Sequence, residues 1–388
     1  MNKKVGLIPC HEYTSELVYQ ALKDAVELAG ELAVEGKTVL LKPNILFDAP
    51  PEKSLSTHPV FLEAAIRVVR EAGAEQILVG DSPGFQKPGY TGRKSGLRQV
   101  TDENDAIWVD FTAGKFNLKC PEGKVTRQFT VTSILEEVDL VISLPKLKTH
   151  QLMYYTGAMK NLFGLIPSLL KSPFHLSHPS REGFASMIVD LNTGIMAHYA
   201  FMDGIIGMEG HGPAAGNPRE IGVVLASSNL LAMDVTACSL IGYAPEQIPI
   251  NTEALSRGIW LDSFEEVEVV GCDPLPLTIK DFEKIPMTSR KSQLEDFLLP
   301  NVIRKVREKF APVPVFYKAP CVYCGDCIRI CPAAALEFTG RGEHRKVSVD
   351  YSKCIRCYCC HEICGVNAID VKRKPLKVLF PGHQESKK

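Results

Sequence analysis

The chain has 388 residues, of which 45% are hydrophobic and 23% are charged, proportions typical of a soluble globular protein. A formal net charge of −1 argues against a protein that binds nucleic acid or anionic membranes. The N-terminal sequence has no apolar segment of signal-peptide length, and no run approaches the roughly eighteen apolar residues of a membrane helix. We therefore expect a cytoplasmic protein with neither nucleic-acid nor membrane partners, and the length favours two domains.

Residues 1–310 alternate apolar, strand-like runs with helical patterns, which predicts one large domain. Amphipathic helices are predicted at 15–34 and 59–74, where apolar residues recur at helical spacing. Near-continuous apolar strands alternating with helices are typical of an α/β fold, in which helices cover a largely parallel sheet. Long loops are predicted at 85–128 and 167–183, which mix Gly, Lys and Pro without a clear period. Strands are predicted at 4–8, 38–44, 76–82, 139–146, 201–207, 221–227 and 267–271.

Polar residues follow several of these predicted strands. In an open parallel sheet, ligands bind outside the carboxyl ends of the strands, so these residues are candidates for a binding site. Lysines that converge there would suit a phosphate, a carboxylate or an anionic cofactor. His150 is the candidate proton donor, because imidazole titrates near neutrality, and Asp81 and Glu209 are further candidates for proton handling. The residues proposed to bind the small anionic ligand or cofactor are Lys42, Asn44, Lys146, Lys148, Lys160 and Asn161.

Each of these residues also has an ordinary structural interpretation. A single lysine after a strand is most often solvated, a single histidine is most often hydrogen-bonded within the fold, and Asp81 or Asp203 would serve as a turn or helix cap. His58, His175 and His178 are metal or acid–base candidates that no spacing selects. No Walker A loop is present, and the glycines of GHGPAAG do not match a dinucleotide fingerprint. A nicotinamide cofactor is therefore not predicted.

The chain changes character after a final helix predicted at 291–310. The segment 311–320, APVPVFYKAP, contains three prolines and is predicted to be an extended linker, because proline disfavours helix. The remaining residues, 321–388, hold nine of the 13 cysteines and end in a basic tail. Such clustering indicates metal binding rather than disulfide bonds.

These cysteines form two arms that share the spacing C-x2-C-x2-C-x3-C. Three thiolates two residues apart on a tight loop suit one face of an iron–sulfur cluster, whereas zinc sites, the alternative, usually use paired C-x2-C knuckles. In the second arm Gly365 replaces the proline that follows the first arm, and Cys359 is a rival ligand beside Cys360. The arms consist of Cys321, Cys324, Cys327 and Cys331, and of Cys354, Cys357, Cys360 and Cys364.

Over residues 321–370 this spacing resembles that of bacterial two-cluster ferredoxins. In that family the fourth cysteine of each arm ligates the other cluster. The resemblance implies a small α+β domain that holds two [4Fe–4S] clusters. It assigns the first cluster to Cys321, Cys324, Cys327 and Cys364, and the second to Cys354, Cys357, Cys360 and Cys331.

Six motifs in the large domain carry a second resemblance: KPN (42–44), STHP (56–59), GDSPG (80–84), LPKLKTH (144–150), GAMKNLFG (157–164) and DGIIGMEGHGP (203–213). Together they resemble the DUF362 family, a domain of unknown function, over about residues 4–240. Members of that family frequently carry a C-terminal two-cluster ferredoxin domain, as this chain does. A remote similarity to the nickel-pincer lactate racemase fold supplies no catalytic residues that can be placed on this sequence.

These observations lead to one main hypothesis and two alternatives. The main hypothesis is an iron–sulfur oxidoreductase, in which the clusters pass electrons to or from a small anionic substrate or cofactor in the α/β domain, with a redox protein as partner. The alternatives are an electron carrier or maturation factor whose large domain docks a protein partner, and a non-redox isomerase with structural clusters. The sequence identifies neither the substrate nor any further organic or metal cofactor.

Overall fold

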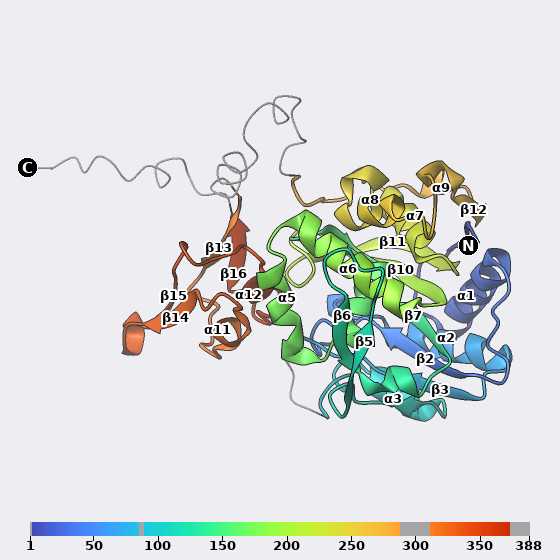
Figure 1. The fold of residues 1–388 in the computed structure, drawn as a ribbon, viewed down its shortest axis with the longest axis horizontal. Helices are drawn as coiled ribbons and strands as arrows, with labels where there is room; N and C mark the ends of the chain where they lie inside the picture. The colour runs from blue at the N-terminus through green and yellow to red at the C-terminus, as the bar shows by residue number, and fades with distance from the viewer. Residues whose placement is uncertain (1, 85–88, 288–310, 373–388) are drawn as a thin grey trace, which may run out of the picture. The chain divides into compact units, whose positions relative to one another are not determined.

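The computed structural model describes residues 2–84, 89–287 and 311–372, and the chain forms two units, Met1–Ile285 and Pro286–Lys388 (Figure 1). Ten described strands of the first unit form one sheet, in the spatial order β12, β1, β11, β10, β7, β2, β3, β4, with β8 beside β10 and β9 beside β8. The bounds are β1 (Lys4–Pro9), β2 (Thr38–Pro43), β3 (Gln76–Val79), β4 (Ile107–Trp108), β7 (Leu140–Leu144), β8 (Lys146–His150), β9 (Tyr154–Thr156), β10 (Tyr199–Glu209), β11 (Asn217–Ser227) and β12 (Glu268–Gly271).

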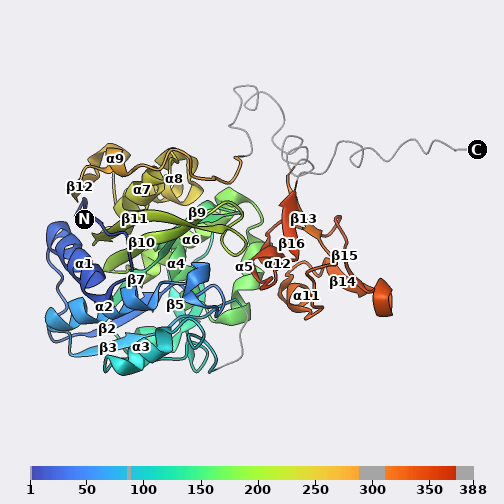
Figure 2. The ribbon, with the colours of Figure 1, turned by 180° about the vertical axis from the view of Figure 1, so that it is seen from behind.

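Most neighbouring strands in this sheet are parallel. Among the described strands of this sheet, two run antiparallel to their neighbours. These are β11, which is antiparallel to β1 and β10, and β9, which is antiparallel to β8. Figure 2 shows β10 and β11 side by side as the two longest strands. The predicted α/β fold with a largely parallel sheet is confirmed.

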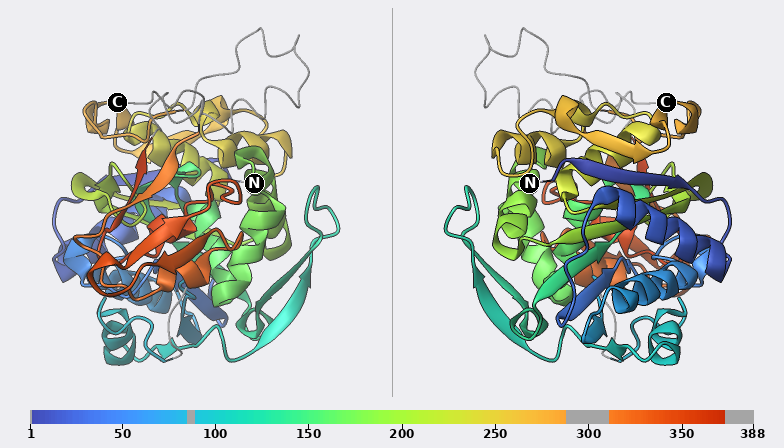
Figure 3. Two further views of the ribbon diagram at one scale, coloured as in Figure 1. Left: turned by 90° about the vertical axis from the view of Figure 1, so that its left-hand side faces the viewer. Right: turned by 90° about the vertical axis from the view of Figure 1, so that its right-hand side faces the viewer.

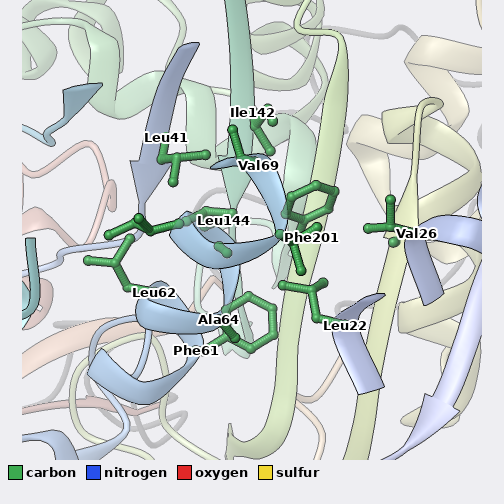
Figure 4. Packing of buried hydrophobic residues seen from close by; sticks show 14 of the residues in the cluster. Leu22, Val26, Leu41, Phe61, Leu62, Ala64, Val69, Ile142, Leu144 and Phe201 are labelled. Atoms are coloured by element: carbon green, nitrogen blue, oxygen red, sulfur yellow. The ribbon is translucent and has the colours of Figure 1, made fainter. Parts of the chain in front are cut away.

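Helices cover this sheet, and the pair formed by α1 and α2 encloses a large hydrophobic core (Figure 4). Leu22 of α1 and Phe61 of α2 are fully buried against Leu144 and Phe201 of the sheet. Burial of each such side chain stabilises the fold by about 1.5–3 kcal/mol. The helices of this unit are α1 (Ser15–Ala29), α2 (Pro59–Glu71), α3 (Leu97–Glu103), α4 (Ala158–Asn161), α5 (Ser172–Ser177), α6 (Arg181–Ile195), α7 (Leu230–Leu240), α8 (Pro249–Ser256) and α9 (Pro274–Leu277).

The loops predicted at 85–128 and 167–183 contain regular structure, so that prediction is corrected. The first segment includes α3, β4 and the first strand of a hairpin, drawn in turquoise in Figure 3, and the second includes α5. Residues of the hairpin strand Lys115–Lys119 alternate between exposed and partly buried, a short two-residue period that is easily missed among Gly and Lys. Helix α5 has six residues, which is too short to display a helical period. The hairpin strands are β5 (Lys115–Lys119) and β6 (Gln128–Thr132).

The described residues of the second unit form two antiparallel strand pairs and two short helices. β13 pairs with β16, β14 pairs with β15, and α11 packs against α12. Because β13 lies inside the segment 311–320, the predicted linker is wrong for these residues. Among the described strands β13 pairs with β16 alone, and such an edge strand tolerates proline. The helix predicted at 291–310 lies outside the described residues. The bounds are β13 (Val313–Phe316), α11 (Asp326–Ile330), β14 (Leu336–Thr339), β15 (Lys346–Val349), α12 (Cys359–Glu362) and β16 (Ile369–Lys372).

Candidate functional site

Lys42, near the end of β2, is fully buried at the centre of a polar network at the carboxyl edge of the sheet. Its Nζ lies 2.7 Å from Asp81 Oδ1 and donates to Asn161 Oδ1 at 3.1 Å and to the Pro43 carbonyl at 2.8 Å. Asp81 also accepts a hydrogen bond from Ile45 N at 2.7 Å. Burial lowers the pKa of Lys42, and the adjacent Asp81 carboxylate opposes this change.

Asn44 extends this network from β2 to β8. Its Nδ2 donates to Asn161 Oδ1 at 3.3 Å, and its Oδ1 accepts from Lys148 Nζ at 2.6 Å. Lys148 is 1% exposed and also donates to the Leu55 carbonyl at 2.9 Å. The structure therefore brings together five of the predicted site residues, which are Lys42, Asn44, Asp81, Lys148 and Asn161.

Gly164, the last residue of the GAMKNLFG motif, permits close packing against this network. A Cβ atom at this position would lie 2.2 Å from Asp81 Oδ1 and 2.6 Å from Lys42 Nζ. Contacts that short are incompatible with any side chain unless the ion pair moves. The motif therefore requires glycine here for close approach to the ion pair.

Lys171, which no sequence motif selects, joins the same edge of the sheet. Its ammonium group donates to the Ser82 carbonyl, directly after Asp81. Burial lowers the pKa of Lys171 to about 7, the Asp81 carboxylate opposes this change, and Lys42 and Lys160 lower the pKa further. The sequence contains little indication of this placement, because Lys171 lies in a segment that has neither a hydrophobic period nor a recognised motif.

Lys146 belongs to a second cluster, although it lies on β8 with Lys148. Its Nζ is 2.8 Å from Asp203 Oδ2 and donates to Tyr13 Oη at 2.6 Å, while the Tyr13 hydroxyl donates to Asp203 Oδ1 at 2.7 Å. The Tyr13 ring stacks on His58 with 3.6 Å between ring centroids. Burial lowers the pKa of His58 to about 4; the Asp203 carboxylate opposes this, and Lys146 adds to it. Lys146 and Lys148 thus have different partners.

Three further predicted residues, His150, Glu209 and Lys160, lie on β8, β10 and α4, respectively. His150 is 1% exposed, and its Nδ1 accepts from two backbone amides of the turn after β8, at 3.1 and 3.2 Å. Glu209 accepts from the backbone amide of Glu283 at 3.0 Å and lies 3.7 Å from Arg219 Nη1. Lys160 is partly buried on α4. The catalytic roles of His150 and Glu209 stay predictions.

In the second unit, cysteines surround a cavity. Four of its lining residues are the predicted ligands of the second cluster, Cys331, Cys354, Cys357 and Cys360; Cys359, the rival ligand, is not among the described residues that line it. Within the described ranges, no three His, Cys, Asp or Glu side chains form a site for a single metal ion. The thiolates of a [4Fe–4S] cluster bind four different irons, so they need not converge on one point. Thiolates around a cavity therefore fit such a cluster.

The predicted ligands of the first cluster also lie near one another. Burial raises the pKa of Cys327 to about 11, and the neighbouring thiols of Cys324, Cys364 and Cys321 raise it further. This set combines three cysteines of the first arm with the fourth cysteine of the second arm. The cross-over of ligands implied by the ferredoxin resemblance is thus compatible with the structure.

The two arms repeat in backbone conformation as well as in sequence. The fourth cysteine of each arm accepts a hydrogen bond from the amide four residues later, at 3.3 Å for Ala335 to Cys331 Sγ and 3.2 Å for Ala368 to Cys364 Sγ. Positive φ angles occur at matching positions of both arms: Tyr323 and Arg356, Gly325 and Tyr358, Ala334 and Asn367. Such left-handed residues produce tight loops that turn backbone amides inward, an arrangement that suits anionic clusters.

Two family models match the chain. DUF362, a domain of unknown function, matches residues 39–239, and a 4Fe-4S dicluster domain matches residues 314–365. The chain belongs to the DUF362 family. Both resemblances noted in the sequence are thereby confirmed, and the dicluster domain makes this DUF362 member an iron–sulfur protein. A thylakoid-associated protein of Synechocystis sp. is 29% identical over 315 residues, which cover 80% of this chain and 95% of that protein.

Two solved structures are similar to part of the chain. The lactate racemase apoprotein from Thermoanaerobacterium thermosaccharolyticum gives a TM-score of 0.41 at 11% identity, over 60% of this chain and 56% of that one. A protein from Thermotoga maritima gives 0.38 at 14% identity, over 58% of each chain. The chain thus spans little more than half of either structure. Among the described residues, no helix is both long and apolar enough to cross a membrane.

Proposed function

We propose that this DUF362 protein is an oxidoreductase that passes electrons, through two [4Fe–4S] clusters, to or from a small anionic ligand at the carboxyl edge of the large sheet. One observation carries the proposal: a single chain joins a dicluster domain to a unit whose strand ends gather buried lysines. Covalent linkage keeps donor and acceptor at an effective concentration of the order of millimolar, without any new contact.

The cysteine sets would hold the two clusters, which supply one-electron transfer when bound. The amides of Ala335 and Ala368 donate to the cysteine sulfurs, and such hydrogen bonds stabilise negative charge and thus the reduced state. The proposed ligands are Cys321, Cys324, Cys327 and Cys364 for the first cluster, and Cys331, Cys354, Cys357 and Cys360 for the second.

The lysines at the strand ends would attract the anionic ligand. Because Lys42 and Lys148 are buried, their charges act at low effective dielectric, where an attraction is stronger than in water. Asp81 would position Lys42 through the contact at 2.7 Å. His150 and Glu209 are proposed as proton-handling groups, and their roles require the identity of the ligand.

We place the protein in the cytoplasm, where reducing conditions protect iron–sulfur clusters, and we propose a redox protein as the external electron partner. Neither nucleic acid nor a membrane is proposed as a partner, since the net charge of −1 favours neither.

The test begins with anaerobic purification and mass spectrometry of the small molecule that copurifies. The reduced protein is then mixed with that molecule, and reoxidation of the clusters and conversion of the molecule are followed together. We expect both to occur with matching electron count, and about eight irons per chain. Conversion by the oxidised protein alone would indicate an isomerase, and cluster cycling without effect on the molecule would indicate an electron carrier.

A matched control is the variant Cys331→Ser/Cys364→Ser, which removes one proposed ligand from each cluster. It should bind the copurified molecule as the wild type does but convert none of it. Conversion at the wild-type rate by this variant would contradict the proposed role of the clusters.

A further inference from the structure

The STHP motif (56–59) crosses the carboxyl edge of the sheet and is fixed there by hydrogen bonds. The Thr57 hydroxyl accepts from Asn44 N at 2.8 Å and donates to the Leu144 carbonyl at 2.7 Å. The next amide, His58 N, donates to Asp203 Oδ2 at 2.9 Å. Asn44 follows β2, Leu144 ends β7 and Asp203 lies on β10. The backbone of His58 is therefore held by three strands of the sheet.

The imidazole ring of His58 is fixed as well. It stacks on the Tyr13 ring with 3.6 Å between centroids and 12° between planes. As the N-cap of α2, its Nδ1 accepts from Val60 N at 3.3 Å. A backbone amide can only donate, so Nδ1 carries no proton, and the neutral ring carries its proton on Nε2. This contact thus selects the tautomer together with the ring position.

The Nε2–H group of His58 is available to a solute. The side chain is partly exposed, and Nε2 has no hydrogen-bond partner among the described residues. Burial lowers the pKa of His58 to about 4, and the Asp203 carboxylate opposes this change. Lys146 lowers the pKa further, and Glu52 opposes it. His58 is therefore a neutral hydrogen-bond donor near pH 7.

A second residue of the motif also indicates a ligand. The hydroxyl of Ser56 is buried, at 6% exposure of the residue, and has no hydrogen-bond partner among the described residues. A buried hydroxyl is normally hydrogen-bonded, so Ser56 points to a polar group from outside the chain. The preceding residue, Leu55, accepts from Lys148 Nζ through its carbonyl at 2.9 Å, which places a positive charge beside the same segment. Both observations favour an anionic ligand next to the motif.

We propose that His58 is a further catalytic residue of this edge, whose Nε2–H donates a hydrogen bond to an anionic oxygen of the ligand. A neutral imidazole suits an oxygen on which negative charge develops, because it stabilises that charge and keeps its own proton. A carboxylate and a phosphate both offer such an oxygen. This inference rests on the proposed function, because it adds a residue to the same site.

The first test observes the imidazole nitrogens directly. Full-length protein labelled with 15N-histidine is purified anaerobically with oxidised clusters, and the NMR signals of His58 are identified by their loss in His58→Asn. Near pH 7 we expect a neutral ring protonated on Nε2; an imidazolium ring or a proton on Nδ1 would overturn the inference. Acetate and inorganic phosphate are the two probes. At least one should shift the Nε2 signal saturably, which identifies the class of oxygen, whereas no shift with either would contradict the proposed contact.

Matched substitutions separate this role from a structural one. His58→Asn keeps a side-chain acceptor at the N-cap and removes the Nε2–H donor. Calorimetric titration should show that it binds the effective probe at least about tenfold more weakly, the effect of losing a charge-assisted hydrogen bond. His58→Gln, whose longer amide again provides a donor, should recover part of this loss. His198→Asn, the control, changes an exposed histidine directly before β10 and should bind as the wild type does.

Three results of these titrations would overturn the inference: wild-type affinity in His58→Asn, no recovery in His58→Gln, or an equal loss in His198→Asn. None of the measurements requires reduced clusters. A negative result would therefore leave the proposed electron transfer untouched, and absence of electron transfer would leave the hydrogen bond of His58 measurable.

Discussion

Replacement of Asp81 by asparagine keeps the shape of the side chain and removes its charge. Lys42, which is fully buried, would retain its hydrogen bond to Asn161 but lose its ion pair at 2.7 Å. Removal of one partner from a buried ion pair costs about 3–5 kcal/mol, because the other charge stays buried without compensation. For a unit of this size, that cost corresponds to a decrease in Tm of roughly 6–15 °C.

The chain offers a separate probe for each unit. Its two tryptophans, Trp108 and Trp260, both lie in the first unit, so tryptophan fluorescence reports unfolding of that unit, and visible absorbance of the clusters reports the second. Asp102→Asn, which removes an exposed carboxylate on α3, is the control and should shift the Tm by at most about 2 °C. The double variant Lys42→Met/Asp81→Asn removes both charges and should recover part of the loss.

The loss should depend on pH in one direction. Burial lowers the pKa of Lys42 in the folded protein below its ordinary value of 10.5. At pH values between the folded-state pKa of Lys42 and 10.5, Lys42 binds a proton in the unfolded chain more often than in the folded protein. The free energy of unfolding therefore rises with pH in this range. Asp81→Asn removes the carboxylate that raises the pKa of Lys42, so this pKa falls further in the variant. The loss of stability relative to the wild type therefore becomes smaller as the pH approaches 10.5. A loss below about 1 kcal/mol, or a loss that grows with pH, would refute the idea of an uncompensated buried charge.

Three further experiments test other parts of the structure. Cys360→Ala should reduce the iron content to about four per chain, whereas Cys359→Ala should leave it at the wild-type value; equal losses in an iron assay would contradict the ligand assignment. Gly164→Ala should destabilise the first unit by about 1–3 kcal/mol in tryptophan-monitored unfolding, because its Cβ would overlap the ion pair, and a neutral result would mean that this pair relocates freely. Tyr13→Phe removes a hydroxyl that bridges a buried ion pair and should cost about 1–2 kcal/mol more than Tyr90→Phe, an exposed control; equal effects would show that the bridge contributes nothing.

The strands were predictable where burial on both faces leaves a continuous apolar run. One boundary was not: the predicted strand 139–146 is divided at Pro145 into β7 and β8, and β8 continues through KLKTH. All five residues of β8 are buried, although two are lysines and one is a histidine. Sequence patterns place such residues outside a strand, because the partners that offset their burial, Asp203 and Asn44, are distant in the chain.

The candidate site was predictable to the extent that topology determines it. Lys42 lies near the end of β2, Asp81 follows β3, and Lys148 follows β7 in the chain, within β8. The carboxyl ends of parallel strands share an edge. Lys171 was missed because its contact with Ser82 joins segments that are 89 positions apart, which no local pattern reveals. In the second unit, by contrast, cysteine spacing alone was informative, since the chemistry of a cluster restricts the positions of its ligands.

The two buried Lys–Asp pairs at this edge are difficult to explain by stability. A buried ion pair is often no more stable than apolar side chains of similar volume, because desolvation offsets the attraction between the charges. The pairs Lys42–Asp81 and Lys146–Asp203 nevertheless lie on a sheet whose other buried positions are mostly apolar. Costly buried charges concentrate where a protein binds ligands or performs chemistry, whereas a surface that only docks a protein needs exposed charges. Their burial therefore favours a ligand-binding role of the large unit over the alternative of an electron carrier whose large unit serves only for docking.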